Sequence, residues 1–99
     1  MTAELIVAPE AQQDVDEAYS WYEDRRHGLG EEFLDCVDAA IQRISRTPEL
    51  YAKIYNDYRR ALVRRFPYAV FYEYANGKLY VYSIFHTSQN PEKWKKRLM

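Results

Sequence analysis

Several features that define other classes of small protein are missing from this chain. Among its 99 residues there is one cysteine, Cys36, so no internal disulfide can form. His27 and Cys36 have no partners at the spacing of metal ligands, and we therefore expect no metal site and no cofactor. The sequence also contains no glycine-rich phosphate loop and no motif of the kind that surrounds a catalytic nucleophile.

Long apolar runs are absent as well. No run approaches the roughly 20 residues that span a membrane. The N-terminus has no basic segment followed by an apolar one, so we expect no signal peptide. A single cysteine fits a reducing compartment, and we expect a cytoplasmic protein. The composition, 47% hydrophobic and 16% aromatic, is typical of one globular domain over residues 1–99.

The net charge of −1 conceals opposite charges in the two halves of the chain. Residues 1–52 carry 4 Lys and Arg against 12 Asp and Glu, whereas residues 53–99 carry 10 against 3. A basic half favours an anionic partner, either a nucleic acid or an acidic protein segment. The alternative is that the two halves neutralise each other within one fold.

The first half of the chain predicts a strand followed by two helices. Residues 4–8 are apolar and short, and we expect them to join a sheet. Apolar residues then recur at helical spacing over residues 9–26 and again over residues 30–46. Gly28, Leu29 and Gly30 separate the two helices, which we expect to form an antiparallel hairpin packed on one face of the sheet. The Asp and Glu residues of the first helix are expected to form a solvated face.

The second half predicts three strands, over residues 59–66, 68–74 and 78–86. Asn76-Gly77 between the last two tolerates the positive φ angles of a tight hairpin turn. Pro67 can donate no backbone hydrogen bond and is expected to mark a bend.

Two further segments complete the prediction. A short basic helix is expected from Pro91 onward, whereas residues 49–57 receive no predicted structure. The elements together predict a single small α+β domain with the order strand, helix, helix and three strands. Its helical hairpin packs on a mainly antiparallel sheet, and a short helix ends the chain.

A set of residues spread over nearly the whole chain carries a family resemblance. They are Ala11, Asp14, Trp21-Tyr22-Glu23, Gly28-Leu29-Gly30, Phe33-Leu34, Pro48, Arg59-Arg60, Phe66-Pro67-Tyr68, Tyr72, His86, Asn90-Pro91 and Trp94. In this order and spacing the chain resembles the RelE/ParE superfamily of toxins from bacterial type II toxin–antitoxin systems. The resemblance implies a cytoplasmic toxin that is neutralised by its cognate antitoxin in a hetero-oligomer.

Members of this superfamily divide by target. RelE-like toxins cut mRNA in the ribosomal A site without a metal, whereas ParE-like toxins inhibit DNA gyrase and are not known as nucleases. RelE-like members commonly carry Arg where this chain has Ala69, and many carry Arg where it has Gln89. The resemblance therefore favours a ParE-like toxin that inhibits gyrase by protein–protein contact and is not an enzyme.

Two alternatives remain open. One is a ribosome-dependent mRNA endoribonuclease, in which His86, Arg64 and Arg65 are the catalytic candidates. His86 could equally be a structural residue at the end of a strand. The other alternative is a superfamily member that binds its antitoxin but is not toxic.

Two basic segments are the candidates for partner contacts. The arginines of the first predicted strand flank apolar residues, which suits an amphipathic acidic antitoxin segment, although a solvated strand edge would look the same. The predicted antitoxin-binding residues are Arg59, Arg60, Arg64 and Arg65. The predicted target-binding residues lie in the C-terminal helix and are Lys93, Trp94, Lys95, Lys96 and Arg97.

Eight of the ten tyrosines lie between Tyr51 and Tyr82. They could stack on bases of a nucleic acid. Tyrosine is also a favoured strand residue, and Tyr72, Tyr74, Tyr80 and Tyr82 could instead pair across the hairpin, which is the interpretation we prefer.

Overall fold

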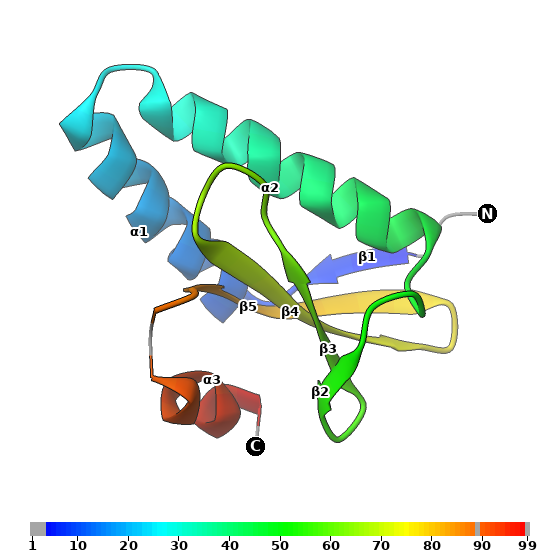
Figure 1. Cartoon of the computed structure of the whole chain (residues 1–99). Coiled ribbons are helices and arrows are strands. Elements are labelled where there is room, and N and C mark those ends of the chain that lie inside the picture. Colours follow the sequence, from blue (N-terminus) through cyan, green and yellow to red (C-terminus); the bar gives the residue numbers. More distant parts are fainter. Residues whose placement is uncertain (1–3, 89, 99) are drawn as a thin grey trace.

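The computed structural model describes residues 4–88 and 90–98 of the chain. Its elements are β1 (Glu4–Val7), α1 (Pro9–Arg25), α2 (Leu29–Arg46), β2 (Lys53–Tyr55), β3 (Tyr58–Leu62), β4 (Tyr68–Ala75), β5 (Lys78–His86) and α3 (Pro91–Leu98). The strands form one sheet in the order β1-β5-β4-β3-β2 (Figure 1). β1 runs parallel to β5 and every other neighbouring pair is antiparallel. The predicted α+β fold is confirmed.

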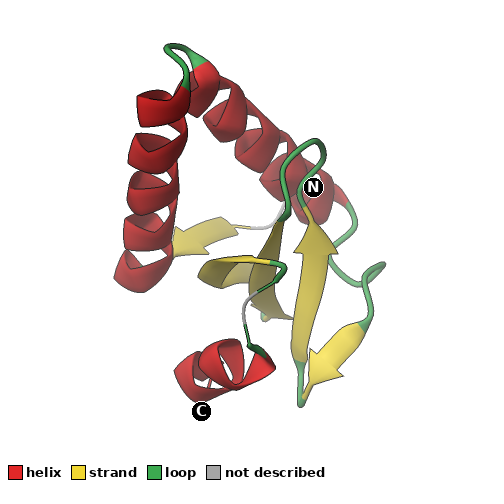
Figure 2. Cartoon of the chain, turned by 60° about the vertical axis from the view of Figure 1, so that its left-hand side comes forward, coloured by secondary structure: helices red, strands yellow, loops and turns green. Residues whose placement is uncertain are grey.

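The α1–α2 hairpin covers one face of the sheet, and α3 lies apart from the α1–α2 loop, beside the end of β5 (Figures 1 and 2). The main core lies between this hairpin and the sheet. A smaller apolar cluster of Ala69, Phe71 and Phe85 lies on the opposite face, with Ile54 packed against it. None of the helices that the structure describes is long and apolar enough to cross a membrane.

The helices form where the apolar spacing predicts them, because one stripe of each can be buried against the sheet. The buried stripe of α1 is Ala11, Val15, Ala18 and Tyr22. The buried stripe of α2 includes Phe33, Val37, Ala40 and Ile44. Glu31 and Glu32 lie in the first turn of α2 and Arg43 and Arg46 in its last turn, where each sign of charge favours the helix dipole.

The strand predicted over residues 59–66 is too long, since β3 ends at Leu62. The chain then bends, and Arg65 adopts a positive φ of 71°. The bend breaks the strict alternation of strand faces, so Phe66 does not share a face with Leu62. Phe66 instead enters the main core, with its ring 4.9 Å from that of Tyr22 and 5.3 Å from that of Phe33. Burial of this aromatic side chain outweighs continuation of the strand.

The predicted hairpin turn is confirmed, because Asn76 and Gly77 have φ angles of 54° and 73°. The cross-strand pairing of tyrosines is wrong, however. An irregularity after Phe71 places Tyr72 opposite Val81 and Tyr74 opposite Leu79. Tyr72 is buried in the main core, whereas Tyr82 contacts the ring of Tyr58 at 5.2 Å.

Residues 49–57, for which the sequence predicts no structure, contain a fourth strand of the second half. β2 pairs with β3 at the edge of the sheet. The Arg59 guanidinium donates hydrogen bonds to the backbone oxygens of Glu49 and Tyr51, at 3.1 and 2.5 Å. The Tyr72 hydroxyl donates another to the backbone oxygen of Pro48 at 2.8 Å. These contacts hold residues 49–57 against the sheet. No local pattern in the sequence predicts them.

Candidate functional site between α1 and α3

The edge of β5 is only partly covered by β1. Their pairing runs from Glu4 opposite Lys78 to Val7 opposite Val81, after which the chain turns into α1. Beyond that point Asp14 of α1 takes the place of a neighbouring strand, and its carboxylate accepts the backbone N–H of Ile84 at 3.0 Å. A strand edge with free N–H groups is open to pairing with other chains, so Asp14 protects this part of it.

A groove lies along this edge, with α1 as one wall and α3 as the other. We call it the α1–α3 groove. Its volume is about 810 Å³. The residues that line it come from α1, the start of β4, the end of β5, the turn after β5 and α3. They are Asp14, Glu17, Ala18, Trp21, Tyr22, Tyr68, Ile84, Phe85, His86, Ser88, Lys93, Lys96 and Arg97.

Asp14 also ties α3 to the rest of the molecule. Its carboxylate accepts a hydrogen bond from Arg97, whose guanidinium lies 4.4 Å from the centre of the Phe85 ring. Leu98, the residue after Arg97, is buried. Burial raises the pKa of the Asp14 carboxyl, and the hydrogen bonds from Ile84 and Arg97 oppose that shift. The first helix is therefore not uniformly solvated as predicted, since Asp14 is one of two carboxylates in it with a structural role.

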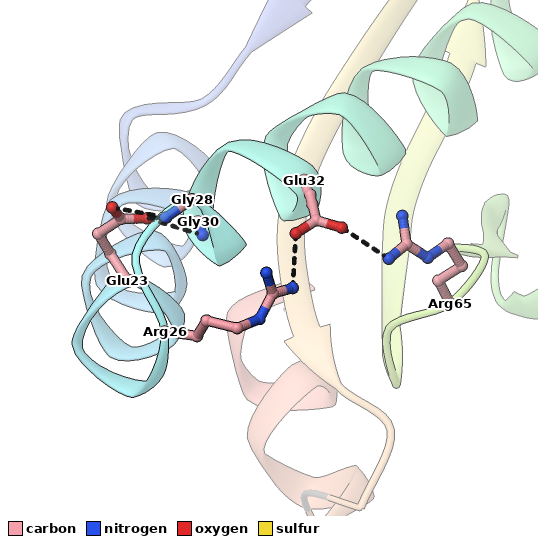
Figure 3. A network of polar contacts seen from close by, with 6 residues as sticks. All are labelled: Glu23, Arg26, Gly28, Gly30, Glu32 and Arg65. Atoms are coloured by element: carbon pink, nitrogen blue, oxygen red, sulfur yellow. Dashed lines mark hydrogen bonds and ion pairs between the residues drawn. The ribbon is translucent and has the colours of Figure 1, made fainter.

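Glu23 is the second such carboxylate of α1. It accepts the backbone N–H groups of Gly28 at 3.0 Å and of Gly30 at 3.0 Å, at the start of α2 (Figure 3). These N–H groups have no partner within the helix, so a carboxylate from the preceding helix satisfies them. The hydrogen bond from Gly28 lowers the pKa of Glu23, with smaller contributions from Gly30 and nearby cations.

The geometry of His86 defines its tautomer. The backbone N–H of Ser88 lies 3.1 Å from His86 Nδ1, and the Ser88 hydroxyl oxygen lies 2.7 Å from the same atom. A backbone N–H can only donate, so Nδ1 carries no proton and Nε2 is the N–H donor of the ring. The ring also packs edge-on to Tyr68, with centroids 5.2 Å apart. Burial raises the pKa of the Tyr68 hydroxyl, which stays protonated at neutral pH.

The two walls of the groove differ in charge. The α1 wall presents Glu17 together with Trp21, whose residue surface is 51% exposed. The Arg25 guanidinium lies 4.0 Å above the Trp21 ring and holds one face of the indole. The α3 wall presents Lys93 and Lys96, which are exposed and have no ion-pair partner among the described residues.

The four arginines predicted to bind the antitoxin differ in their contacts within the fold. Arg59 lies beside Tyr72 and holds residues 49 and 51 as described above. Arg65 donates to Glu32 at 2.9 Å, and Glu32 also binds Arg26 at 2.6 Å (Figure 3). The guanidinium groups of Arg59 and Arg65 are therefore already engaged within the fold.

Arg60 and Arg64 are exposed, and neither has a hydrogen bond or ion pair among the described side chains. Their role in an antitoxin contact stays a prediction. Neither Arg64 nor Arg65 lines the α1–α3 groove, so the geometry does not group His86 with them as a catalytic set.

The predicted target-binding residues of α3 fall into two groups. Lys93, Lys96 and Arg97 line the groove, with Arg97 bound to Asp14. Lys95 does not line it. Gln89 and the side chain of Trp94 lie outside the part of the chain that the structure describes.

Sequence reasoning missed Glu17, Trp21, Tyr68 and Ser88 as parts of one site. Glu17 and Trp21 are one helical turn apart, which placed them together on a face of α1, but nothing local connected that face with α3. Within residues 4–88 and 90–98 no three His, Cys, Asp or Glu side chains gather as metal ligands. The expectation that the protein needs no metal stays a prediction.

Comparison with known proteins assigns the family. Residues 5–91 match the family model described as the ParE toxin of the type II toxin–antitoxin system, parDE. The chain belongs to the ParE toxin family. The predicted resemblance to ParE-like rather than RelE-like toxins is thereby confirmed, and the match spans every element from β1 to the first residue of α3.

Individual ParE proteins are similar over most of the chain. The curated relatives "Toxin ParE2" of Mycobacterium tuberculosis strains CDC 1551 / Oshkosh and ATCC 25618 / H37Rv are each 29% identical over 92 residues. Each alignment covers 92% of this chain and 88% of the relative. A solved chain titled "Chromosomal ParDE TA system from P. aeruginosa" has a TM-score of 0.78 and 12% identity. The match covers 88% of this chain and 98% of the solved chain, and it shows that the two share a fold.

Proposed function

We propose that this ParE-family chain is a toxin that inhibits DNA gyrase by protein–protein contact and is neutralised by a cognate antitoxin. The observation that carries the proposal is the family match over residues 5–91. That match includes the whole helical hairpin and all of the sheet except the first residue of β1.

The surroundings of Ala69 support inhibition over RNA cleavage. Nuclease relatives commonly have an arginine here, where it can stabilise the charge of a phosphoryl-transfer transition state. In this chain Ala69 is 2% exposed and packs with Phe71 and Phe85 in the smaller apolar cluster. A buried apolar position offers no cation to a phosphate, which favours a non-enzymatic toxin.

The basic part of the sheet supports an acidic antitoxin segment as the neutralising partner. Arg60 and Leu62 of β3 share one sheet face, and Leu62 is 59% exposed. An exposed leucine beside an unpaired guanidinium suits an amphipathic segment that carries both carboxylates and apolar side chains. We assign the antitoxin contact to Arg60, Leu62 and Arg64.

The exposed lysines of α3 support a role in target contact. Lys93 and Lys96 project from a helix that is anchored through Arg97 and Leu98, so their charges are held on an ordered element. Positive charge held in this way steers association with an acidic protein surface.

Three measurements test the proposal. Expression of the chain alone should arrest bacterial growth, and co-expression of the antitoxin encoded beside it should restore growth. Purified toxin should block supercoiling by gyrase or trap cleaved DNA. Ribosome-bound mRNA in a reconstituted translation mixture should stay intact.

The alternatives give different results in the same experiments. Cleavage of A-site mRNA with gyrase unaffected would overturn the proposal in favour of an endoribonuclease. In that case His86→Ala should lower cleavage by roughly 10²–10⁴-fold, as expected for the loss of a general acid or base. Normal growth at verified soluble expression, with antitoxin binding retained, would identify a non-toxic member.

A double variant of α3 distinguishes the proposed contact with the target from the contact with the antitoxin. Lys93→Glu with Lys96→Glu should weaken gyrase inhibition while leaving antitoxin binding unchanged. This double variant is sharper than deletion of residues 91–99, because deletion also removes the contacts of Arg97 and Leu98 with the domain. Unchanged gyrase inhibition in the double variant would move the target contact away from α3.

A further inference from the structure

We propose that the α1–α3 groove binds a nucleoside 5′-phosphate and selects guanine as its base. The inference concerns a ligand of the toxin itself and does not depend on gyrase inhibition. The volume of the α1–α3 groove, about 810 Å³, is within the range of small-molecule pockets, roughly 300–1,000 Å³. The chemistry of its walls, taken in turn, identifies the ligand.

Trp21 provides a surface for base stacking. Trp21 lines the groove and is 51% exposed, although tryptophan is usually mostly buried. Arg25 lies over the indole at 4.0 Å from its centre, and the Tyr22 ring is perpendicular to the indole with ring centroids 5.1 Å apart. These contacts restrain the ring, and we place the base on the face of the indole opposite Arg25. Stacking on a base is worth roughly 1–3 kcal/mol in single-strand binding proteins.

Glu17 specifies which base can stack there. It lies one helical turn before Trp21, so both side chains project from the same face of α1. A carboxylate offers only acceptors. Guanine presents two adjacent donors, N1–H and the N2 amino group, which one carboxylate can accept together. Adenine and cytosine present a single amino donor beside an acceptor nitrogen, and uracil presents one N–H between two carbonyls.

The opposite wall suits the phosphate. Lys93 and Lys96 bring two positive charges that no described carboxylate neutralises. Asp14, the other acid of the groove, is already bound to Arg97 and Ile84. The His86 Nε2–H and the Tyr68 hydroxyl add donors between the walls.

The polarity of the groove distinguishes a nucleotide from an acidic peptide. An acidic peptide would meet repulsion from Glu17 along the α1 wall. A guanine nucleotide carries its donors at one end and its anion at the other, which matches a carboxylate on α1 and ammonium groups on α3.

The test is a direct binding measurement on the purified, antitoxin-free chain without gyrase. Isothermal titration calorimetry at low salt compares GMP, AMP, CMP and UMP, with inorganic phosphate as the anion control. We expect GMP to bind roughly tenfold or more tightly than the other three, the range of one good bidentate contact to a base. Affinity for all four should fall as salt is raised.

Two variants separate the base site from the phosphate site. Glu17→Gln should remove the preference for GMP over AMP while retaining binding of both. Lys93→Ala with Lys96→Ala should weaken all four nucleotides and leave their ratios unchanged. Glu10→Gln on the same helix and Lys78→Ala at the hairpin are matched controls outside the groove and should change neither quantity. The ratio between nucleotides is independent of the fraction of folded protein, so a destabilised variant still gives a result.

The source of the guanine is resolved by the same assay. Oligonucleotides of DNA and RNA with a 5′-terminal guanosine 5′-phosphate are compared with free GMP and dGMP. Tighter binding of GMP points to a free nucleotide, and tighter binding of one oligonucleotide points to a strand end of that kind. Equal binding of all four bases, displacement of GMP by equimolar phosphate, or no binding at millimolar GMP would overturn the proposal.

Discussion

Two glycines act at the scale of single residues, for different physical reasons. Gly30 allows α1 and α2 to approach closely, since a Cβ there would lie 2.8 Å from ring atoms of Tyr19 and 2.9 Å from its backbone oxygen. Gly77 has open space around it, but its φ of +73° strains any residue with a branched side chain. Substitution of Gly30 is limited by space, and substitution of Gly77 is limited by backbone conformation.

Gly30→Ala should destabilise the domain by about 1–3 kcal/mol, the usual cost of adding a methyl group where the packing has no room. Denaturant unfolding followed by circular dichroism measures this loss. In a Tyr19→Ala background the loss should be smaller but not zero, because the backbone oxygen of residue 19 remains in place. Full recovery in that background would mean that the helices separate easily at this point.

Gly77→Val should cost on the order of 1 kcal/mol or more, because a β-branched residue at positive φ is strained. The same unfolding measurement detects it. Lys78→Val, next to the turn but within β5, is the control and should have little effect. A melting temperature for Gly77→Val equal to that of the wild type would contradict the assigned turn.

At the scale of elements, carboxylates join segments that the sequence leaves separate. Glu23 connects α1 to the start of α2, and Glu32 connects the α1–α2 loop to the bend after β3 through Arg26 and Arg65 (Figure 3). Asp14 joins α1, β5 and α3. The layers of the domain are thus cross-linked by charge-assisted hydrogen bonds as well as by the apolar core.

The pKa of Glu32 gives this network a pH dependence. The hydrogen bond from Arg65, followed by that from Arg26, lowers the pKa of Glu32 below its ordinary value of 4.5. A lowered pKa in the folded state adds stability above pH 4.5, and that stability is lost as the pH falls through the folded-state pKa.

Glu32→Gln should therefore be slightly less stable than the wild type at pH 7, and the difference should close in acid. The effect is small because the pair is partly exposed to solvent and screened. Urea unfolding at pH 7, 5 and 3 measures it, with Asp35→Asn on the same helix as control. A difference that stayed constant over this range would mean that the Glu32 charge does not stabilise the fold.

At the scale of the whole molecule, the two oppositely charged halves do contact each other. Glu32 and Asp14 of the acidic half bind Arg65 and Arg97 of the basic half. Neutralisation within the fold therefore accounts for part of the asymmetry, as the sequence allowed. Arg60 and Arg64 remain outside these pairs among the described residues.

Charge reversal of Arg60 and Arg64 should weaken the antitoxin complex and flatten its dependence on salt. The reason is that attraction between exposed charges is screened over roughly 8 Å at physiological salt, so removing the attraction removes the screening effect. Affinities of Arg60→Glu with Arg64→Glu are compared with those of Arg46→Glu, an exposed arginine at the end of α2. Wild-type affinity in the double variant would place the contact elsewhere, most plainly on the helical hairpin.

Much of the candidate site could not be read from the chain. Lys93, Lys96 and Arg97 were singled out as a basic helix, and His86 as a strand-end histidine, but their grouping with Glu17 and Trp21 depends on how α3 folds back. The contact that holds α3 there joins Arg97 to Asp14, which are 83 positions apart in the sequence. Local spacing carries no information on pairs so distant.

The sequence by itself determined the two helices, the hairpin at Asn76-Gly77 and the α+β class, because helical periodicity and turn chemistry are local properties. Only the tertiary structure decided that β3 ends at Leu62, that residues 53–55 form a strand, and which arginines stay free. Two of these outcomes show how a distant partner competes with the local preference. Phe66 leaves the strand to pack against the rings of Tyr22 and Phe33. Arg65 is paired with Glu32, which lies 33 positions earlier in the sequence. Burial of an aromatic ring and pairing of a charge outweigh the small preferences that a strand pattern expresses.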